Sequence, residues 1–467
     1  MSVPPPPTET RNVAEEAKAL WQLAWPIVLA QVGFMFMGVV DTVFAGPLGA
    51  ESLGALAIGN ISFFALFVLG AGVLRSLDAY ASQAWGAGRV EDCARGLAQA
   101  HWLALLMTPP LAVAILLVPD FLTLIGYEPE LVQITRDYIR PTVWGLPAGL
   151  LFAGYRSFLS AVNVTKPIMF AAAAANVCNF AMDWVLIDGK FGAPALGVIG
   201  IAWATAACRF VMFGVLGATV ALHPRFADFP KIVRAPDPAL MKKLAGIGIP
   251  IGLTIFAEVG AFGGTGVMMG LKGAVPLAAH QVALNVTALL FMVPLGIASG
   301  AAVRSGQALG AGDVEAISRA GRAALYVGVV YAVISASVLW FLREPIGRLY
   351  RVTDDVLELT VVFLGVAALF QLVDVLQVLG NGVLRGLGDT RLPFLFTLIG
   401  YVILGMPAGY VGAFILSDDP IWLWYGLTLG LAVVSVLAVL RFRWQIRRLR
   451  AREDALSHGG RRPAITP

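Results

Sequence analysis

Four acidic residues stand inside otherwise apolar runs of the chain, and their carboxyl groups could do chemistry there. They are Asp41, Asp183, Glu258 and Asp374. A carboxylate at the centre of a membrane-spanning helix costs about 2.5 to 3.5 kcal/mol on insertion scales, so it requires a partner, a proton or a water-filled cavity. Such groups can hold protons, Na⁺ or a cationic substrate. We therefore expect sites for cation exchange.

The composition of the 467-residue chain places these acids in a membrane. Hydrophobic residues make up 58% of the chain, charged residues only 13%, and the mean hydropathy is +0.80. Soluble domains hold about 25% charged residues, whereas runs of about 20 apolar residues are typical of membrane helices. The net charge of +4 could suggest a nucleic-acid partner, but the basic residues lie in short segments between apolar runs. We expect a lipid bilayer and no nucleic acid.

About twelve apolar runs are separated by short polar segments. Basic residues are concentrated between the sixth and seventh runs and in RFRWQIRRLRAR near the end of the chain. The positive-inside rule therefore predicts that both termini are cytoplasmic, in a multi-pass protein of the cell inner membrane. The runs cover residues 19–45, 53–80, 95–118, 131–154, 167–187, 196–221, 240–270, 277–301, 319–342, 357–381, 393–416 and 421–442.

An internal repeat appears when each position is compared with the position 224 residues later. Each half holds about six helices, an even number, so both halves enter the membrane from the same side. Parallel repeats of this kind are a transporter architecture, with the substrate site between the halves. The aligned features are Pro26 with Pro250, Gly49 with Gly273, and SQAWGAGRVEDCAR at 82–95 with GQALGAGDVEAISR at 306–319.

The expected fold is an all-α membrane protein with about twelve transmembrane helices in two six-helix bundles. A pseudo-two-fold axis along the membrane normal should relate the bundles. The predicted parts are a disordered cytosolic tail at 1–18, an N-terminal bundle at 19–222, a cytosolic linker at 223–239, a C-terminal bundle at 240–445 and a basic cytosolic tail at 446–467.

Two of the acids differ in their helical surroundings. Asp41 lies late in the first apolar run, with Phe34 and Met37 at helical spacing on the same face. A helix-terminal role for Asp41 is the alternative. Glu258 has Phe34 as its repeat mate, so this acid is not a symmetric structural element. The alternative for Glu258 is a protonated side chain that only bonds a neighbouring helix.

Amide side chains accompany the other two acids and one further run. Stripes of this kind line water, but Asn and Gln also bridge membrane helices through hydrogen bonds, and both readings stay open. The members are Asn176 and Asn179 before Asp183, Gln371, Gln377 and Asn381 around Asp374, and the separate pair Gln281 and Asn285.

Lys and Arg are not expected at the depth of these acids, so each half should present a negative cavity. The four His residues are scattered, the three Cys residues lack metal-ligand spacing, and no phosphate-binding loop appears, so we do not expect an enzyme or a bound cofactor. A channel would require a continuous charged or carbonyl ring, and the asymmetric placement of the acids argues against one. An ion gradient would supply the energy, at about 2.3 kcal/mol per elementary charge per 100 mV.

The sequence resembles the multidrug and toxic compound extrusion transporters, in their NorM-like branch, over about residues 15–445. The resemblance implies two six-helix bundles around a V-shaped cavity, and efflux of small amphiphilic organic cations in exchange for Na⁺ or H⁺. The family's carboxylates carry over onto Asp41, Glu258 and Asp374. The motifs are VDTVFAG around Asp41, SQAWGAGR at 82–89, GKFGAPALGVIGIAWAT at 189–205, PIGLTIFAE around Glu258, AAHQVALNV at 278–286 and VLRGLGDTRLP at 383–393.

One position departs from the branch that the chain resembles. NorM-like members usually carry Asn where this chain has Asp183, whereas other branches couple an Asp there with the acid of the first helix, the preceding Asn and a Thr of the sixth helix. The resemblance thus implies Asn179 and Thr205 as partners, with Tyr138 facing the same cavity. A cation site is expected in each half, for Na⁺ or H⁺. The alternative is that Asp183 is a protonated hydrogen-bond partner.

Two expectations about substrate and assembly complete the interpretation. A lipid-linked oligosaccharide flippase of the same superfamily is the alternative function, although it would require arginines that line the cavity and hold phosphate. We expect the chain to act as a monomer.

Overall fold

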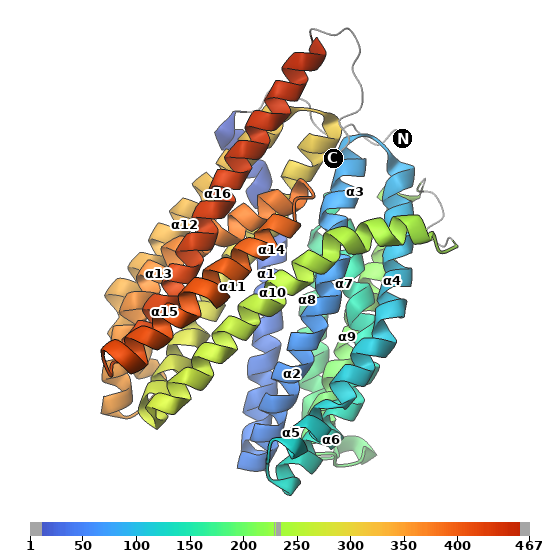
Figure 1. The fold of residues 1–467 in the computed structure, drawn as a ribbon. Helices are drawn as coiled ribbons and strands as arrows, with labels where there is room; N and C mark the ends of the chain where they lie inside the picture. Colours follow the sequence, from blue (N-terminus) through green and yellow to red (C-terminus); the bar gives the residue numbers. More distant parts are fainter. Residues whose placement is uncertain (1–11, 228, 230–234, 458–467) are drawn as a thin grey trace. The chain divides into compact units, whose positions relative to one another are not determined.

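The computed structural model describes residues 12–227, 229 and 235–457 of the chain. The expected tail before residue 12, part of the expected linker and the last ten residues lie outside the described residues. Every regular element in the described part is helical (Figure 1). This agrees with the all-α expectation, because helices satisfy their own backbone hydrogen bonds inside a bilayer.

The described residues of the first half form nine α-helices and three short 3₁₀ helices. They are α1 (Val13–Ala45), η1 (Gly46–Leu48), α2 (Ala50–Leu74), α3 (Ser76–Gly86), α4 (Val90–Leu116), α5 (Val118–Leu124), α6 (Pro129–Trp144), α7 (Leu146–Ala161), α8 (Lys166–Leu186), η2 (Lys190–Gly192), α9 (Val198–Leu222) and η3 (Pro224–Phe226).

The second half has longer helices, and one of its spans contains π-helical segments. The elements are α10 (Pro238–Lys272), α11 (Ala274–Ala311), α12 (Val314–Leu349), α13 (Asp354–Gly386), α14 (Arg391–Thr397), the π-helical η4 (Leu398–Gly405), α15 (Met406–Val411), the π-helical η5 (Gly412–Leu416) and α16 (Ile421–Ser457).

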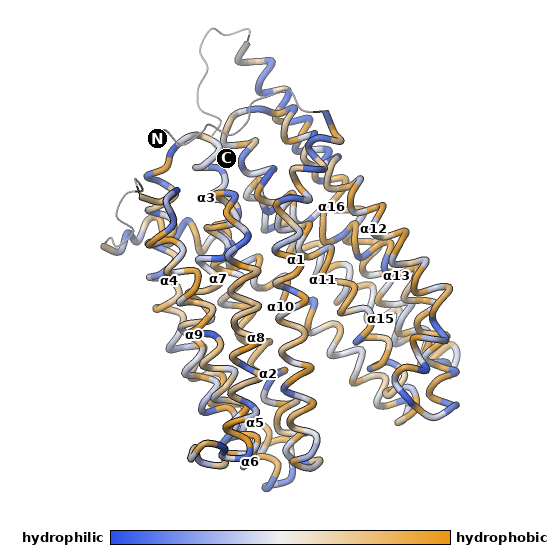
Figure 2. The backbone as a smooth tube through the Cα atoms, turned by 180° about the vertical axis from the view of Figure 1, so that it is seen from behind, coloured by the Kyte–Doolittle hydropathy of each residue, from blue (hydrophilic) through white to orange (hydrophobic). Residues whose placement is uncertain are grey.

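Eleven helical segments of the described chain are long and apolar enough to cross a membrane, against about twelve expected. The difference lies at the run expected over 131–154. There α6 ends at Trp144 and α7 begins at Leu146, so neither piece reaches 18 residues. The chain is a multi-pass membrane protein. Hydrophobic residues run along the helices of both halves (Figure 2), and large side chains such as Phe64, Trp144 and Trp340 are exposed, as lipid-facing residues are.

The repeat predicted from the sequence is confirmed in the backbone. Gly49 and Gly273 precede α2 and α11 with φ of 99° and 120°, and Gly88 and Gly312 precede α4 and α12 with φ of 70° and 71°. Positive φ is tolerated well only by glycine, which explains why these four positions are glycines. Both repeats therefore turn the chain in the same way at the same two points.

The chain forms two compact units, and two helices are divided between them. The first unit comprises Leu29–Trp85 and Arg89–Gly252, and the second comprises described residues 12–28, 86–88 and 253–457. The divisions within α1 and α10, after Val28 and after Gly252, are 224 residues apart, so they fall at the same repeat position. Each lies two residues after the helix-interior Pro26 or Pro250, where a backbone hydrogen bond is lost.

One helix in each unit holds a central place among its neighbours. In the first unit α9 packs against α6, α7 and α8. In the second unit α13 packs against α11, α12 and α16 (Figure 1). Trp424 of α16 is fully buried, and its ring centroid lies 6.0 Å from that of Phe363 and 5.8 Å from that of Phe370 on α13. The central helices α9 and α13 also carry several of the polar side chains described next.

Candidate cation and substrate sites

Asp41 on α1 is the centre of a polar group in the first unit. Its side chain is 3% exposed. Asn179 of α8 donates to its Oδ1 at 2.9 Å, and Thr205 of α9 donates to its Oδ2 at 3.3 Å. Three helices thus bring together three residues that the sequence motifs had associated.

Asp183 lies one helical turn after Asn179 on α8 and is fully buried. Its carboxyl group is close enough to that of Asp41 for the two acids to be electrostatically coupled. Among the described residues, no donor reaches either Asp183 oxygen or the Oδ1 of Asn179. Buried acceptor oxygens without donors are rare in native proteins and require an explanation such as a bound proton, ion or water. Oxygen atoms of this kind are also the ligands that alkali cations such as Na⁺ prefer.

Tyr138 on α6 is a fully buried neighbour of this group. Its hydroxyl donates to Oδ1 of Asn60 on α2 at 2.9 Å, and its ring occupies the space over Gly59, where a Cβ would lie 2.5 Å from the ring. Tyr138 also interacts electrostatically with Asp41. Asn60 was not expected to contribute, although a lone amide in the run ALAIGNISFF was a visible signal.

Arg209 overturns the expectation that Lys and Arg are absent at the depth of the acids. It lies at the middle of α9, four residues after Thr205, and interacts electrostatically with Asp41. Its Nη1 donates to the Thr142 carbonyl at 3.0 Å, and its guanidinium carbon lies 3.8 Å from the ring centroid of Phe63. The basic residue within TAACRFVMF was visible in the sequence and was missed.

The remaining cavity candidates of the first unit are held by packing or by backbone contacts. Asn176 donates to the Gly33 carbonyl at 3.0 Å and to the carbonyl one turn back in its own helix. Phe34 meets Phe152 edge to face, with centroids 5.7 Å apart, and Met37 is 8% exposed. The Asn176 bond joins α8 to α1, the helix that carries Asp41.

The second unit brings Glu258 and Asp374 together. Gln377 of α13 donates to Oε1 of Glu258 on α10 at 2.6 Å. Asp374, one turn before Gln377, is 4% exposed, and the charged group that acts on it is Glu258. Tyr401 of η4 is almost fully buried and interacts electrostatically with both acids. The buried phenol of Tyr401 therefore lies near the two acidic side chains of this pair.

Three predicted amides of the second unit make no hydrogen bond to Glu258 or Asp374 in the described part of the chain. Gln371 is fully buried, and both polar atoms of its side chain have no partner among the described residues. Gln281 and Asn285 are exposed on α11, and Asn285 donates to the Gln281 carbonyl at 3.0 Å. In the described part of the chain, no group of three or more His, Cys, Asp or Glu residues could hold a metal ion.

The fold and these paired acids define a membrane transporter built from two helical repeats, and comparison with known proteins gives its family. The MatE family model matches residues 26–185 and 250–411, so the chain belongs to the MatE family. It is similar to the multidrug resistance protein MdtK of Yersinia pseudotuberculosis, with 36% identity over 92% of this chain and 95% of that protein. The probable multidrug resistance protein NorM of Bradyrhizobium diazoefficiens is 35% identical, over 94% of this chain and 95% of that protein.

Solved structures show the same fold at low sequence identity. The eukaryotic MATE transporter AtDTX14 superposes with a TM-score of 0.84 at 22% identity, covering 94% of this chain and 99% of that chain. A MOP superfamily transporter from Pyrococcus furiosus superposes with a TM-score of 0.85 at 19% identity, covering 94% of this chain and 99% of that chain.

Proposed function

We propose that the protein is a secondary active multidrug efflux transporter, which exports small amphiphilic organic cations in exchange for Na⁺ or H⁺ by alternating access. The names of the MdtK and NorM relatives support multidrug efflux. The observation that carries the exchange is the group of Asp41, Asp183 and Asn179, where three buried oxygen atoms have no donor among the described residues. A monovalent cation or a shared proton would satisfy them.

The proposed cycle depends on differential binding. The cation neutralises Asp41 and Asp183 in one conformation, and the arrival of the organic cation at acidic side chains favours its release in another. Thr205 and Asn179 would orient Asp41 toward the ion. Glu258 and Asp374 form the second pair of acids to which either cation could bind, with Gln377 and Tyr401 as polar neighbours.

Three further properties belong to this proposal. We place both termini in the cytoplasm, with the protein in the inner membrane, because the positive-inside rule favours the cytoplasmic side for segments rich in Lys and Arg. The chain acts as a monomer. Substrates are small, cationic and drug-like, since acids within a membrane favour positive charge.

A second candidate function is movement of a lipid-linked oligosaccharide, and Arg209 is the observation that favours it. An arginine at this depth could hold a phosphate group. Its guanidinium, however, is engaged by the Thr142 carbonyl and the Phe63 ring. The cation exchanger is therefore the better supported function.

Transport in proteoliposomes would test the choice. An imposed inward gradient of Na⁺ or H⁺ should drive export of a fluorescent organic cation, and Asp41→Asn should abolish that coupling. Asp183→Asn should alter the ion dependence or the stoichiometry. If Asp183→Asn behaves as wild type in both while Asp41→Asn fails, the two-carboxylate site is wrong. If neither gradient drives export and a lipid-linked oligosaccharide is moved instead, the flippase function replaces the exchanger.

A further inference from the structure

Arg209 is a charged residue inside the first unit for which the exchange mechanism has no role. It lies one helical turn after Thr205 on α9, and Thr205 in turn donates to Asp41. Within the described part of the chain, its direct partners are the carbonyl of Thr142 and the ring of Phe63 rather than a carboxylate. Its electrostatic interaction with Asp41 therefore acts without a direct ion pair.

The residues around Arg209 leave space for its side chain and contact its guanidinium group. A Cβ at Gly145 would lie 3.0 Å from Arg209 Cδ and 3.1 Å from its Nη1, and a Cβ at Gly149 would lie 3.4 Å from Cδ. Gly145 lies at the break between α6 and α7, and Gly149 lies one turn later in α7; both leave room for the arginine. Phe63 and the Thr142 carbonyl, near the end of α6, supply a π face and a negative helix terminus, both of which stabilise a cation.

A guanidinium stays protonated in proteins, so Arg209 is a permanent positive charge. The acids Asp41 and Asp183 carry two negative charges when both are ionised, and Arg209 offsets one of them. A site inside a membrane is most stable when its charges balance, because uncompensated buried charge is costly. One further monovalent cation would then bring the group to neutrality, whereas the two acids without Arg209 would require two.

We infer that Arg209 sets the cation capacity of the first unit, limiting the pair Asp41 and Asp183 to one exchangeable monovalent cation. The inference rests on the proposed function, because it assumes that these acids bind the exchanged ion. No bond forms or breaks in the exchange: one Na⁺ or one H⁺ enters from one side and the same ion leaves to the other. Arg209 itself stays charged and in place.

Counting bound cations on the purified full-length protein tests this directly. The first unit is isolated by neutralising the acids of the second with Glu258→Gln and Asp374→Asn. Binding of radioactive Na⁺ and uptake of protons, followed with a pH-sensitive dye, are then measured per protein. We expect one cation for this background and two after Arg209→Gln, a twofold increase.

Three further variants separate charge from structure. Arg209→Lys keeps the charge and should still bind one cation, even where the contact with Thr142 is weakened. Arg209→Gln combined with Asp183→Asn should return the count to one. Asp183→Asn alone leaves Asp41 balanced by Arg209 and should abolish cation binding by the first unit.

The outcomes distinguish this inference from the proposed function. An unchanged count in Arg209→Gln, or full cation binding in Asp183→Asn, would overturn the role of Arg209 while leaving exchange intact. If the native protein binds no cation that a fluorescent organic cation displaces, the proposed function itself fails. Should the full-length protein that carries Glu258→Gln and Asp374→Asn not fold, the same differences of one cation between variants are expected in the native background, and their absence there refutes the inference.

Discussion

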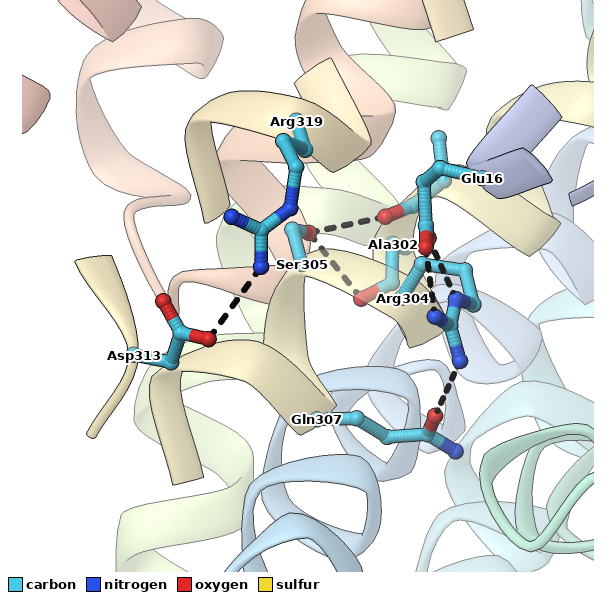
Figure 3. Close-up of polar contacts among 8 residues, drawn as sticks. Glu16, Ala302, Arg304, Ser305, Gln307, Asp313 and Arg319 are labelled. Carbon is cyan, nitrogen blue, oxygen red and sulfur yellow. Dashed lines mark hydrogen bonds and ion pairs between the residues drawn. The ribbon is translucent and has the colours of Figure 1, made fainter. Parts of the chain in front are cut away.

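Glu16 on α1 accepts two hydrogen bonds from the guanidinium of Arg304 on α11, with Nε to Oε1 at 2.6 Å and Nη2 to Oε2 at 2.7 Å (Figure 3). Arg304 also donates to Gln307, one turn along its own helix, at 3.4 Å. The two charged side chains are only 6% and 15% exposed. The pair fastens the first part of α1 within the second unit, while Asp41, on the same helix, belongs to the first.

Removal of one charge from this pair should destabilise the protein. Glu16→Gln leaves the buried Arg304 without its anion, and breaking a buried ion pair from one side costs roughly 3 to 5 kcal/mol. We expect a clear loss of stability in chemical unfolding followed by helical circular dichroism. The control is Glu344→Gln, because Glu344 pairs with Arg348 on the surface, where the side chains are 56% and 68% exposed. That change should cost less than about 1 kcal/mol. Equal stability of the two variants would refute the anchoring role of Glu16.

Asp237 at the start of α10 gives a prediction for the effect of pH. Its Oδ1 accepts from the Leu240 backbone N–H at 3.1 Å, and its Oδ2 accepts from Arg95 at 3.1 Å. The Leu240 hydrogen bond, aided by Arg95, lowers the pKa of Asp237 below its ordinary value. A carboxyl whose pKa is lowered by folding stabilises the protein at pH values above its unfolded pKa of about 3.9, and this contribution is lost as the pH falls through the folded value.

The comparison of wild type with Asp237→Asn isolates that contribution. Asn keeps an acceptor for the Leu240 N–H but carries no charge. We expect wild type to have the higher melting temperature near pH 7, and the difference to shrink below about pH 4. Melting curves over this range provide the measurement. A difference that persists unchanged in acid would show that charge on Asp237 is not its source.

The repeat and the spans could be predicted because they depend on local residue types. The aligned glycines Gly49 and Gly273 indicated equivalent turns in the two repeats, and apolar runs of sufficient length predicted membrane-spanning helices. The break between α6 and α7 was not predicted, because the residues around it, VWGLPAG at 143–149, are apolar and Gly145 is one glycine among many. The local signal at this point is Pro147, which lies in the first turn of α7, where proline is favoured.

The candidate sites were predicted only in part, for a related reason. Isolated acids stand out in apolar sequence, so Asp41, Asp183, Glu258 and Asp374 were found. Their hydrogen-bond partners depend on how the helices are rotated, as with Gln377 and Glu258. Arg209 was equally conspicuous, but its significance comes from the Thr142 carbonyl and the two glycines beside it, and sequence spacing does not reveal these.

Labelling of single cysteines should establish the orientation of the chain. In a background where Cys93, Cys178 and Cys208 are replaced, Ser417→Cys is expected to react with an impermeant thiol reagent from outside the cell. Ala235→Cys is expected to react only after the reagent reaches the cytoplasmic side, because its segment is rich in basic residues. The reverse pattern would place both termini outside and would contradict the orientation that we propose.

Neutralising the acids of the second unit should uncouple drug export from the ion gradient. Glu258→Gln keeps the shape of the side chain that Gln377 contacts at 2.6 Å, and Asp374→Asn keeps the shape of the buried Asp374 side chain. Each substitution removes a negative charge that a cation would balance. Coupling between two ligands is typically worth about 5- to 150-fold in affinity, so its loss should lower gradient-driven efflux by about tenfold or more.

Efflux of a fluorescent cation from proteoliposomes provides this measurement, with the amount of folded protein checked by circular dichroism. Asp418→Asn is the matched control. Asp418 is a fully exposed acid whose pKa is lowered by its hydrogen bond to Lys272. The substitution Asp418→Asn therefore removes one negative charge at a position away from the site, and it should leave efflux unchanged. Loss of efflux in Glu258→Gln and Asp374→Asn, but not in Asp418→Asn, would locate the coupling charge at the second-unit pair. Wild-type efflux by both site variants would instead leave Asp41 and Asp183 as the acids on which coupling depends.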